Sequence, residues 1–342
     1  MSDIVISGCG VVSPAGWGLG ALRAFLDSSE LLETSWIERQ DANGAVVKSA
    51  VARVPEPVDR GVVPKSPRLR RASPVGRYAA AAMAEALGPE KIAGAGRLGV
   101  ICATMNGCVN YSNRFFAEVL ADPSVASPIL FPETVYNAPS SHLSAVTAST
   151  APNDTLIGDG AGIFIALDLA AEWLERGDAD AVLVVAPEEV DWLSAEGLGY
   201  YSSSIIPSEG AAAFLLEKGV GGVRLETVPD VVSYALVPDR KKALCQLWEE
   251  LGVRDDGRTL WVDGRCGVPR FDDAESAISW SGPRISPRLR LGEAMGASAG
   301  FQLAVAVDAL QRGLYESAVV TAVGGNQGVG GGVLGKAEKL KG

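Results

Sequence analysis

The sequence contains few of the residues that bind metal ions or form disulfide frameworks. It has one histidine, His142, and five cysteines in 342 residues. The cysteines show no CxxC spacing and their number is odd, which argues against a zinc site and against a disulfide framework. Free thiols are typical of a reducing compartment, so we expect a cytoplasmic protein without a bound metal.

The chain also lacks long apolar runs and an excess of positive charge. No stretch reaches the roughly 18 uncharged apolar residues that a membrane helix needs. The chain has 30 basic and 41 acidic residues, a formal net charge of -11. No basic stripe could neutralise nucleic acid phosphates, so we expect neither a membrane nor a nucleic acid partner. The one basic cluster, residues 65–71, predicts a solvated helix entry, with a docking patch for an acidic carrier protein as the alternative.

What the sequence does contain is an ordinary globular composition, with 47% hydrophobic and 21% charged residues. Its length exceeds that of one simple core, which predicts two domains or two fused halves, residues 1–220 and 221–342. Apolar segments typical of buried strands alternate with amphipathic segments typical of helices. The same order returns in the second part of the chain. The sequence therefore predicts a layered α/β fold with a duplicated architecture.

The predicted elements follow from these patterns. A buried strand followed by a glycine turn is expected at residues 3–14. Further strands are expected at residues 97–104, 155–158, 179–186, 208–217, 222–235, 259–263, 285–291, 317–323 and 329–334. Helices are expected at residues 19–26, 73–87, 113–120, 163–176, 240–251, 272–279 and 296–312. We expect residues 30–60 to be irregular and residues 131–141 to be extended.

One stretch in the middle of the chain has the pattern of a strand-to-helix elbow. An apolar run ends in the glycine-rich corner at residues 158–162, and an amphipathic helix follows. Many enzymes place a nucleophile at such a corner, where the positive end of the helix dipole lies. Here the corresponding residue is Gly160, which has no side chain.

The glycines of the elbow allow two other interpretations. They could serve tight packing of the strand against the helix, or they could cradle a dinucleotide phosphate. The dinucleotide fingerprint GxGxxG needs a glycine where this chain has Ile163, and it opens a βαβ unit rather than standing in mid-chain. We therefore expect no cofactor.

Four segments together resemble β-ketoacyl synthases of the thiolase fold, and the resemblance covers nearly the whole chain. The segments are the opening strand and turn at residues 4–14, residues 131–142 before the elbow, residues 208–217, and residues 292–299. The last two are similar to the family's Gly-Glu-Gly-Ala strand and its Gly-His-x-x-Gly-Ala-x-Gly segment. The resemblance implies a thiolase-like fold with two α-β-α-β-α layered halves.

The chain departs from this family at all three catalytic positions. The elbow cysteine of the family, which takes up the acyl chain, corresponds to Gly160. The two histidines, which stabilise the enolate formed when a malonyl thioester decarboxylates, correspond to Gly264 or Arg265 and to Glu293. A carboxylate at Glu293 would repel that negative charge. The resemblance therefore implies that the chain is not catalytic alone.

A non-catalytic branch of the family, the chain length factors, has a similar pattern. Its elbow reads about Gly-Glu-Gln-Ala-Gly-Gly, and residues 158–163 fit it better than the catalytic elbow, although the branch's glutamine is missing at Gly160. The resemblance implies a heterodimer with an active ketosynthase in polyketide, aryl polyene or fatty acid biosynthesis. An acyl carrier protein would bind mainly through that partner.

The resemblance also assigns two groups of residues. The partner interface would contain Thr155, Leu156, Ile157, Gly158, Asn137 and His142. The gate of the acyl tunnel would contain Tyr111, Phe115 and Phe116, for which core packing is the alternative. The sequence does not indicate the partner's identity, the acyl length or the degree of reduction.

Two other functions remain open at this point. The chain could be an acyl-thioester enzyme of the same fold that acts through Cys266 or Glu293, or it could be a structural homodimer. The simpler roles are an inert buried thiol for Cys266, an ion pair with a nearby arginine such as Arg265 for Glu293, and a structural hydrogen bond for His142.

Overall fold

The computed structural model describes residues 3–40, 43–94, 96–325 and 328–336. Each half of the chain contributes five strands to one continuous sheet. The first half supplies β1 (Ile4–Ser13), β5 (Leu98–Thr104), β6 (Asn153–Ile157), β7 (Ala181–Glu188) and β8 (Gly210–Lys218). The second half supplies β9 (Val223–Thr227), β11 (Thr259–Val262), β12 (Arg284–Ile285), β13 (Ser317–Val323) and β14 (Gly328–Lys336). Two short strands, β2 (Gly16–Trp17) and β10 (Val232–Ser233), pair with β1 and β14.

The two halves of the sheet have the same topology. The spatial order is β12-β11-β13-β14-β9-β1-β8-β7-β5-β6. If the five strands of each half are numbered in chain order, both halves have the order third, second, fourth, fifth, first from the outer edge of the sheet to its middle. In both halves the first strand runs antiparallel to the fifth and the fifth antiparallel to the fourth, while the other pairs are parallel. The halves join where β1 pairs with β9. The structure thus has the duplicated, layered α/β fold that the sequence predicts.

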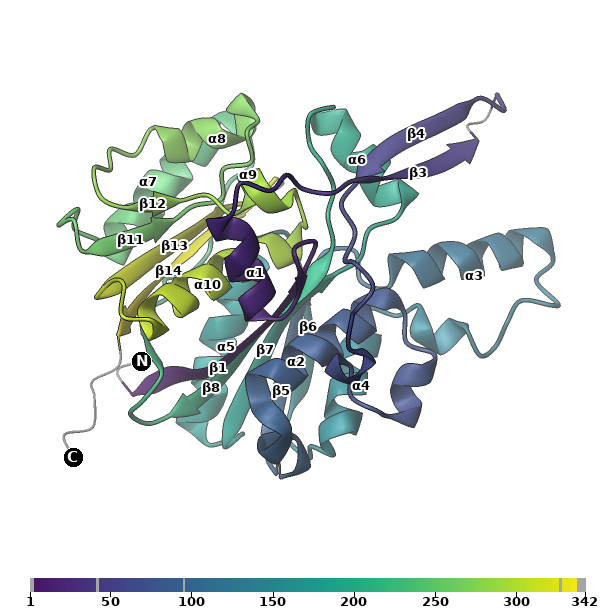
Figure 1. Ribbon diagram of the computed structural model, residues 1–342, viewed down its shortest axis with the longest axis horizontal. Coiled ribbons are helices and arrows are strands. Elements are labelled where there is room, and N and C mark those ends of the chain that lie inside the picture. The colour runs from purple at the N-terminus through teal and green to yellow at the C-terminus, as the bar shows by residue number, and fades with distance from the viewer. Residues whose placement is uncertain (1–2, 41–42, 95, 326–327, 337–342) are drawn as a thin grey trace.

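Helices separate and cover the two halves of the sheet (Figure 1). The central pair, α5 (Gly162–Arg176) and α10 (Gly296–Gln311), packs against strands of both halves. Helices α2 (Pro74–Ala93) and α4 (Ala138–Thr147) cover the outer face of the first half, and α7 (Arg240–Leu251) and α8 (Pro269–Ser276) lie over the second. Every residue of α10 from Gly296 to Leu310 is buried, as expected of a helix enclosed by packed layers.

Alternating side chains on the strands build separate cores on the two faces. On β7, Val182 and Val184 pack toward α5 and α10, while Leu183 and Val185 pack toward α2. On β13 the same alternation places Val320 in the central core and Val319 against α7. Because β7 and β13 are covered on both faces, their buried residues form nearly continuous apolar runs, which is the pattern from which these strands were predicted.

Helix α2 lies so close to β1 that two positions of the strand have no room for a side chain. A Cβ atom on Gly8 would lie 1.9 Å from the carbonyl oxygen of Ala86, and one on Gly10 would lie 2.1 Å from that of Ala82. The contact is fixed further by Glu85 of α2, which accepts hydrogen bonds from the backbone amides of Val11 and Leu19 at 2.8 and 2.7 Å. Glycine is therefore required on β1 for close packing.

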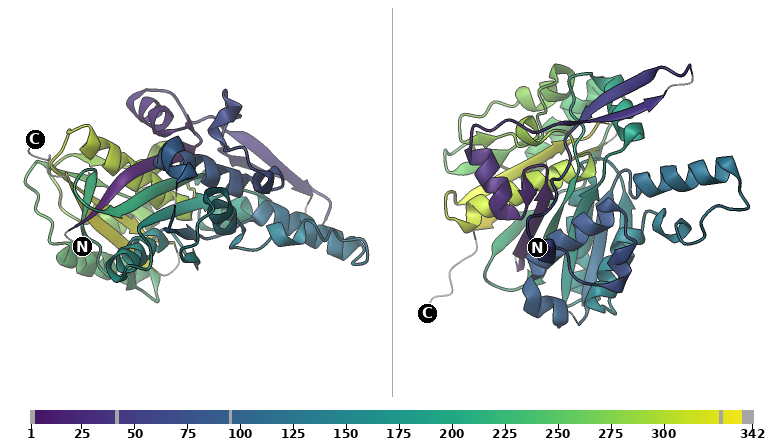
Figure 2. Two further views of the ribbon diagram at one scale, coloured as in Figure 1. Left: turned by 90° about the horizontal axis from the view of Figure 1, so that it is seen from below. Right: turned by 45° about the vertical axis from the view of Figure 1, so that its right-hand side comes forward.

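Residues 30–60, which we expected to be irregular, contain a β-hairpin. Strands β3 (Ser35–Gln40) and β4 (Val46–Val51) form a separate two-stranded sheet that projects from the molecule (Figure 2). Its buried face consists of Ile37 and Val51, which pack on Val190 and Ala195. A lone hairpin is marginally stable, and this one depends on contacts with a distant segment that local sequence patterns do not reveal.

Two further expectations were wrong because Pro139 and Pro287 each stand at the start of a helix. Residues 131–141 are not extended, since they form the short 3-10 helix η3 (Phe131–Glu133) and the start of α4, where Pro139 occupies the first turn and needs no backbone donor. Residues 285–291 are not a strand. Pro287 follows the two-residue strand β12 and leads into the short helix α9 (Arg288–Leu291).

The remaining elements complete the architecture. The helices are α1 (Leu19–Asp27), α3 (Val109–Ala121) and α6 (Trp192–Tyr201), and the 3-10 turns are η1 (Arg60–Val62), η2 (Pro67–Arg70) and η4 (Val237–Asp239). Helix α3 and the β3–β4 hairpin project from the same side of the molecule (Figures 1 and 2). Within the described ranges, no helix has the length and apolar character required to cross a bilayer.

The close approach of α2 to β1 gives a test of the fold. We expect Gly10→Ala to lower the free energy of unfolding by about 2 kcal/mol or more, because its Cβ would overlap helix backbone that cannot move alone. Gly20→Ala on α1 is the matched control, since a Cβ there meets nothing within 4 Å. This control should be neutral or stabilising by about 0.5–1 kcal/mol. Urea denaturation measures both, and equal effects would contradict the packing described.

Candidate functional site

The N-termini of the two central helices meet at a cavity in the middle of the molecule. The elbow residues Asp159 and Gly160 precede α5, and Met295 precedes α10. All three line a cavity of about 70 Å³. Each helix presents the positive end of its dipole to this cavity. Two positive helix ends therefore face one small enclosed space.

The cavity brings together the positions that the sequence comparison singled out. Gly160, Cys266 and Glu293 all line it, although they come from three separate segments. Gly264 lies next to them, since a Cβ there would be 3.3 Å from Nη1 of Arg288. Arg265 does not line this cavity, and its side chain bonds Asp263 and Ser286 instead. Cys266 is thus the side chain that the loop after β11 presents to the cavity.

The glycines of the elbow are not required by tight packing, which corrects one of our expectations. A Cβ on Gly160 would meet its nearest atom, the carbonyl oxygen of Met295, at 3.6 Å. The nearest atoms would be 3.9 Å away at Gly158 and 4.0 Å away at Gly162. These are ordinary van der Waals distances, and none of the three residues has a positive φ. A Cβ atom at position 160 would therefore fit without a backbone change.

Carboxylates of the chain itself occupy both helix ends. Glu293 accepts hydrogen bonds from the backbone amide of Met295 at 2.7 Å and from the Ser298 hydroxyl at 3.0 Å, at the start of α10. At the start of α5, Oδ1 of Asp159 accepts from the amide of Ala161 at 3.2 Å. Glu293 also forms an ion pair with Arg288. Glu293 therefore has the arginine ion pair that we expected, although its partner is Arg288 and not Arg265, because the turn of α9 after Pro287 brings Arg288 within reach.

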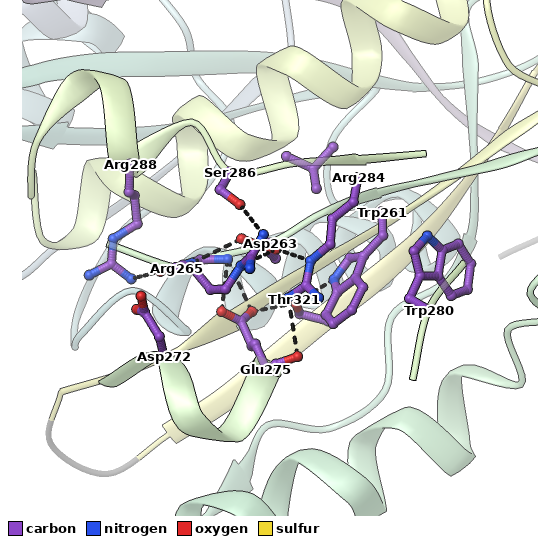
Figure 3. Close-up of polar contacts among 12 residues, drawn as sticks. Trp261, Asp263, Arg265, Asp272, Glu275, Trp280, Arg284, Ser286, Arg288 and Thr321 are labelled. Atoms are coloured by element: carbon purple, nitrogen blue, oxygen red, sulfur yellow. Dashed lines mark hydrogen bonds and ion pairs between the residues drawn. The ribbon is translucent and has the colours of Figure 1, made fainter. Parts of the chain in front are cut away.

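The loop that would carry a catalytic histidine in the family is held by carboxylates along its whole length (Figure 3). The amide of Gly264 donates to both oxygens of Glu275 at 3.0 Å, and the amide of Arg265 donates to Asp263 at 3.0 Å. The next two amides donate to Asp272 at 2.8 and 2.9 Å. Burial and the neighbouring Asp263 raise the pKa of Glu275. The loop is therefore rigid, and its amides are not available to a ligand.

Two buried glutamates at the end of β7 anchor the other wall of the cavity. Glu188 accepts from the amides of Met105 and Asn106, the latter at 3.2 Å, and lies against the first turn of α10. Glu189 accepts from Val75 at 2.9 Å and Asn110 at 2.8 Å, so it joins the first turns of α2 and α3. Burial raises the pKa of Glu188 to about 8 and that of Glu189 to about 7.

The thiol in the cavity does not have the environment of a reactive nucleophile. Cys266 is the one thiol among the described lining residues, and burial raises its pKa, which opposes thiolate formation. His142 lies on α4, where its Nε2 is 2.7 Å from Oε2 of Glu133, in agreement with a structural hydrogen bond. Sequence reasoning did not identify Arg288 and Gln302, whose Nε and Oε1 atoms are buried without a hydrogen-bond partner in the described structure.

The predicted interface residues lie at the free edge of the sheet. β6 is the last strand and pairs only with β5 among the described strands. Thr155 and Leu156 are partly buried, whereas Ile157 is 63% exposed. Hydrogen bonds from Asn153 to the carbonyl oxygen of Ser140 at 2.8 Å and between the Ser140 and Thr155 hydroxyls at 2.9 Å place α4 beside β6. The segment with Asn137 and His142 therefore flanks this edge.

The predicted gate residues lie on the projecting helix α3. Tyr111 is partly buried near the base of the helix, and the ring of Phe115 packs on Phe131 with a centroid separation of 5.4 Å. Phe116 is 61% exposed, so core packing does not account for it. The exposed apolar ring indicates that this face of α3 is not satisfied within the isolated chain.

The buried carboxylate behind the cavity gives a pH-dependent prediction. A pKa of about 8 for folded Glu188, against about 4.3 unfolded, means that the folded state binds the extra proton. Stability should therefore fall as pH rises from about 5 to 8. Glu188→Gln cannot ionise, but it accepts fewer amide hydrogen bonds. Urea denaturation should show wild type more stable at pH 5.5, with the difference shrinking by pH 8.5. A pH-independent difference would contradict the raised pKa.

Comparisons with known proteins agree with this geometry. The family model described as "Beta-ketoacyl synthase, N-terminal domain" matches residues 1–199. No curated protein sequence matches the chain. Among solved structures, the ishigamide ketosynthase/chain length factor is similar with a TM-score of 0.80 and 20% identity, over 98% of this chain and 100% of that one.

Two other solved structures are similar at lower identity. One is described as the ketosynthase ApeO in complex with its chain length factor ApeC from Xenorhabdus doucetiae, with a TM-score of 0.78, 14% identity and 98% coverage of both chains. The other, AntDE:AntF, is described as a type II polyketide synthase acyl carrier protein with its ketosynthase, with a TM-score of 0.75, 17% identity, and coverage of 98% of this chain and 100% of that one. At these identities the likeness concerns the fold. Because the family model covers more than half of the sequence and the whole fold agrees with it, the chain belongs to the β-ketoacyl synthase family.

Proposed function

We propose that this chain is a non-catalytic subunit, of the chain length factor kind, that pairs with an active ketosynthase and shapes its acyl tunnel. The observation that carries the proposal is the cavity itself. The three positions that hold cysteine and two histidines in the family's catalytic members meet there as Gly160, the loop at Gly264–Cys266, and Glu293. The chain keeps the geometry of the family's site and lacks its reactive groups.

The electrostatics of the cavity also disfavour the family's chemistry. Decarboxylation produces an enolate, which needs donors and positive charge that are free to receive it. Here the first turn of α10 is occupied by Glu293, and the charge of Arg288 is compensated by the same carboxylate. An enolate would meet a like charge at the one place where an active enzyme stabilises it.

The free edge of the sheet is a second argument for a partner subunit. An exposed edge strand presents unpaired backbone groups and is normally covered. Exposed apolar side chains occur on β6, on the adjacent central helix and on two further helices: Ile157, Ile165, Leu193, Tyr200 and Phe116. We propose that β6 pairs with a strand of the ketosynthase and that α3 reaches into the interface. Two of the similar structures are described as ketosynthases with chain length factors, in line with this assignment.

A carrier protein would bind mainly through the ketosynthase, and this chain offers one additional contact. Residues 60–84 contain six basic residues and no acidic residue, in a chain with a net charge of -11. The members of the cluster at residues 65–71, Lys65, Arg68, Arg70 and Arg71, are exposed around η2. Such a patch suits an acidic carrier protein, which is the alternative that the sequence left open.

Co-expression tests the heterodimer. With a ketosynthase that has the complete Cys-His-His set, encoded next to this chain, we expect a stable one-to-one complex by size-exclusion chromatography with light scattering. Ile157→Asp should weaken the complex at least tenfold, because it places a charge at the paired edge. Val220→Asp is the matched control, since Val220 is 67% exposed in the turn after β8. A lone homodimer without effect on the synthase would count against the proposal.

The length of the products tests the role of α3. In the assembled complex, Phe116→Ala should lengthen the acyl products by at least one two-carbon unit, and Phe116→Trp should shorten them, because the side chain limits the tunnel by steric blocking. Leu236→Ala, at a side chain 64% exposed in the second half, serves as the control. Mass spectrometry of released products measures the distribution. An unchanged distribution in both Phe116 variants, with the complex intact, would refute the gate assignment.

A further inference from the structure

A second, larger cavity lies apart from the candidate site. It is a groove of about 590 Å³ between α1, β12, α9 and α10, and it shares no lining residue with the central cavity. Figure 1 shows α1 lying over α10, with α9 nearby. Its volume lies within the range of small-molecule sites in proteins, about 300–1,000 Å³. Arg265, one of the two candidates for a family histidine position, lines this groove and not the central cavity, and none of the proposed interface residues lines it.

The groove has an apolar surface along its length. Leu22 and Val305 are buried side chains that line it from α1 and α10. Leu289 and Leu314 are 52% and 54% exposed there. Apolar side chains that remain partly exposed in a groove suit the hydrocarbon part of a ligand.

Four arginines of the lining pair with two buried aspartates, of which Asp308 lines the groove and Asp263 lies outside the lining. Asp263 is fully buried and forms ion pairs with Arg284 and with Arg265, the latter at 2.9 Å (Figure 3). Asp308 of α10 accepts from Nε of Arg23 at 3.0 Å and from Arg312 at 3.4 Å. Each Arg-Asp-Arg triad therefore has one positive charge in excess.

A fifth arginine adds to this excess. Arg290 lines the groove and donates to the carbonyl oxygens of Phe25, Ser28 and Glu30 at 3.1, 3.1 and 2.8 Å. These carbonyls lie at the C-terminal end of α1, where a cation is favourable without a carboxylate partner. Asp27 is the other acidic residue in the lining. The groove thus remains positive in a chain whose net charge is -11, and partly buried charge without compensation is costly.

We propose that this groove binds an anionic amphiphile, with a phosphate monoester head near the two triads and a single hydrocarbon chain along the leucines. Guanidinium groups match phosphate oxygens with paired donors, and arginine keeps its charge in such surroundings. The enclosed position between helices favours a soluble, single-chain ligand over a lipid held in a bilayer. This site is independent of the proposed heterodimer.

Calorimetry on the full chain tests the site directly. We expect n-decyl phosphate, below its micelle concentration, to bind with one-to-one stoichiometry. Inorganic phosphate, which lacks the chain, and n-decyl glucoside, which lacks the charge, should each bind at least tenfold more weakly. Phosphatidylcholine vesicles containing phosphatidic acid test whether the ligand is instead a lipid in a bilayer. Binding of the protein to these vesicles with an affinity equal to that for decyl phosphate would overturn the assignment to a soluble ligand.

The variants remove the excess charge and keep each aspartate paired. Arg265→Gln with Arg312→Gln takes one arginine from each triad and should weaken decyl phosphate binding at least tenfold. Arg254→Gln with Arg258→Gln removes the same charge from an exposed loop and should change affinity less than twofold. Should the first pair fail to fold, Leu289→Asp places a negative charge on the exposed lining and should likewise abolish binding. Absence of binding to wild type, or equal loss in the control pair, would overturn the proposal.

Discussion

Two helices enclosed between the halves of one sheet begin at the same small cavity, and the positive charge of their N-termini has to be compensated there. In an active member of the family, a thiolate and a transient enolate use this field. In this chain Asp159 and Glu293 each accept the backbone amide of the residue just before the helix, Ala161 and Met295, and Arg288 completes the balance. Under the proposed function, the identity of the compensating group distinguishes this chain from a catalytic member without a change in topology.

This balance explains why the architecture is retained although the reactive groups are absent. The cavity walls are fixed by buried carboxylates that hold loops: Glu188 and Glu189 hold the segment before α3, and Glu275 and Asp272 hold the loop after β11. These contacts join elements that lie far apart in the sequence. The same framework positions the edge of β6 and the projecting helix α3, on which the proposed pairing with a ketosynthase depends.

The parts of the structure that could be predicted are the strands and helices whose own residue pattern reflects their burial. The apolar strands β5 and β7 and the amphipathic helix α5 have patterns that follow from their own burial. The β3–β4 hairpin was missed because a distant helix stabilises it, and α9 was missed because Pro287 starts a helix there. The resemblance identified Gly160 and Glu293. It could not identify Arg288 as the partner of Glu293, since that pairing depends on a turn that only the folded chain defines.

The free space beside Gly160 determines which substitutions this position can accept. Since a Cβ there would lie 3.6 Å from its nearest neighbour, packing does not hold the glycine in place, and a single codon change could introduce a thiol. That thiol would stand at a helix end whose field the chain's own carboxylates already oppose. A substitution at position 160 would therefore be accommodated by the packing but opposed by the charges around it, so it would not by itself create a reactive thiol.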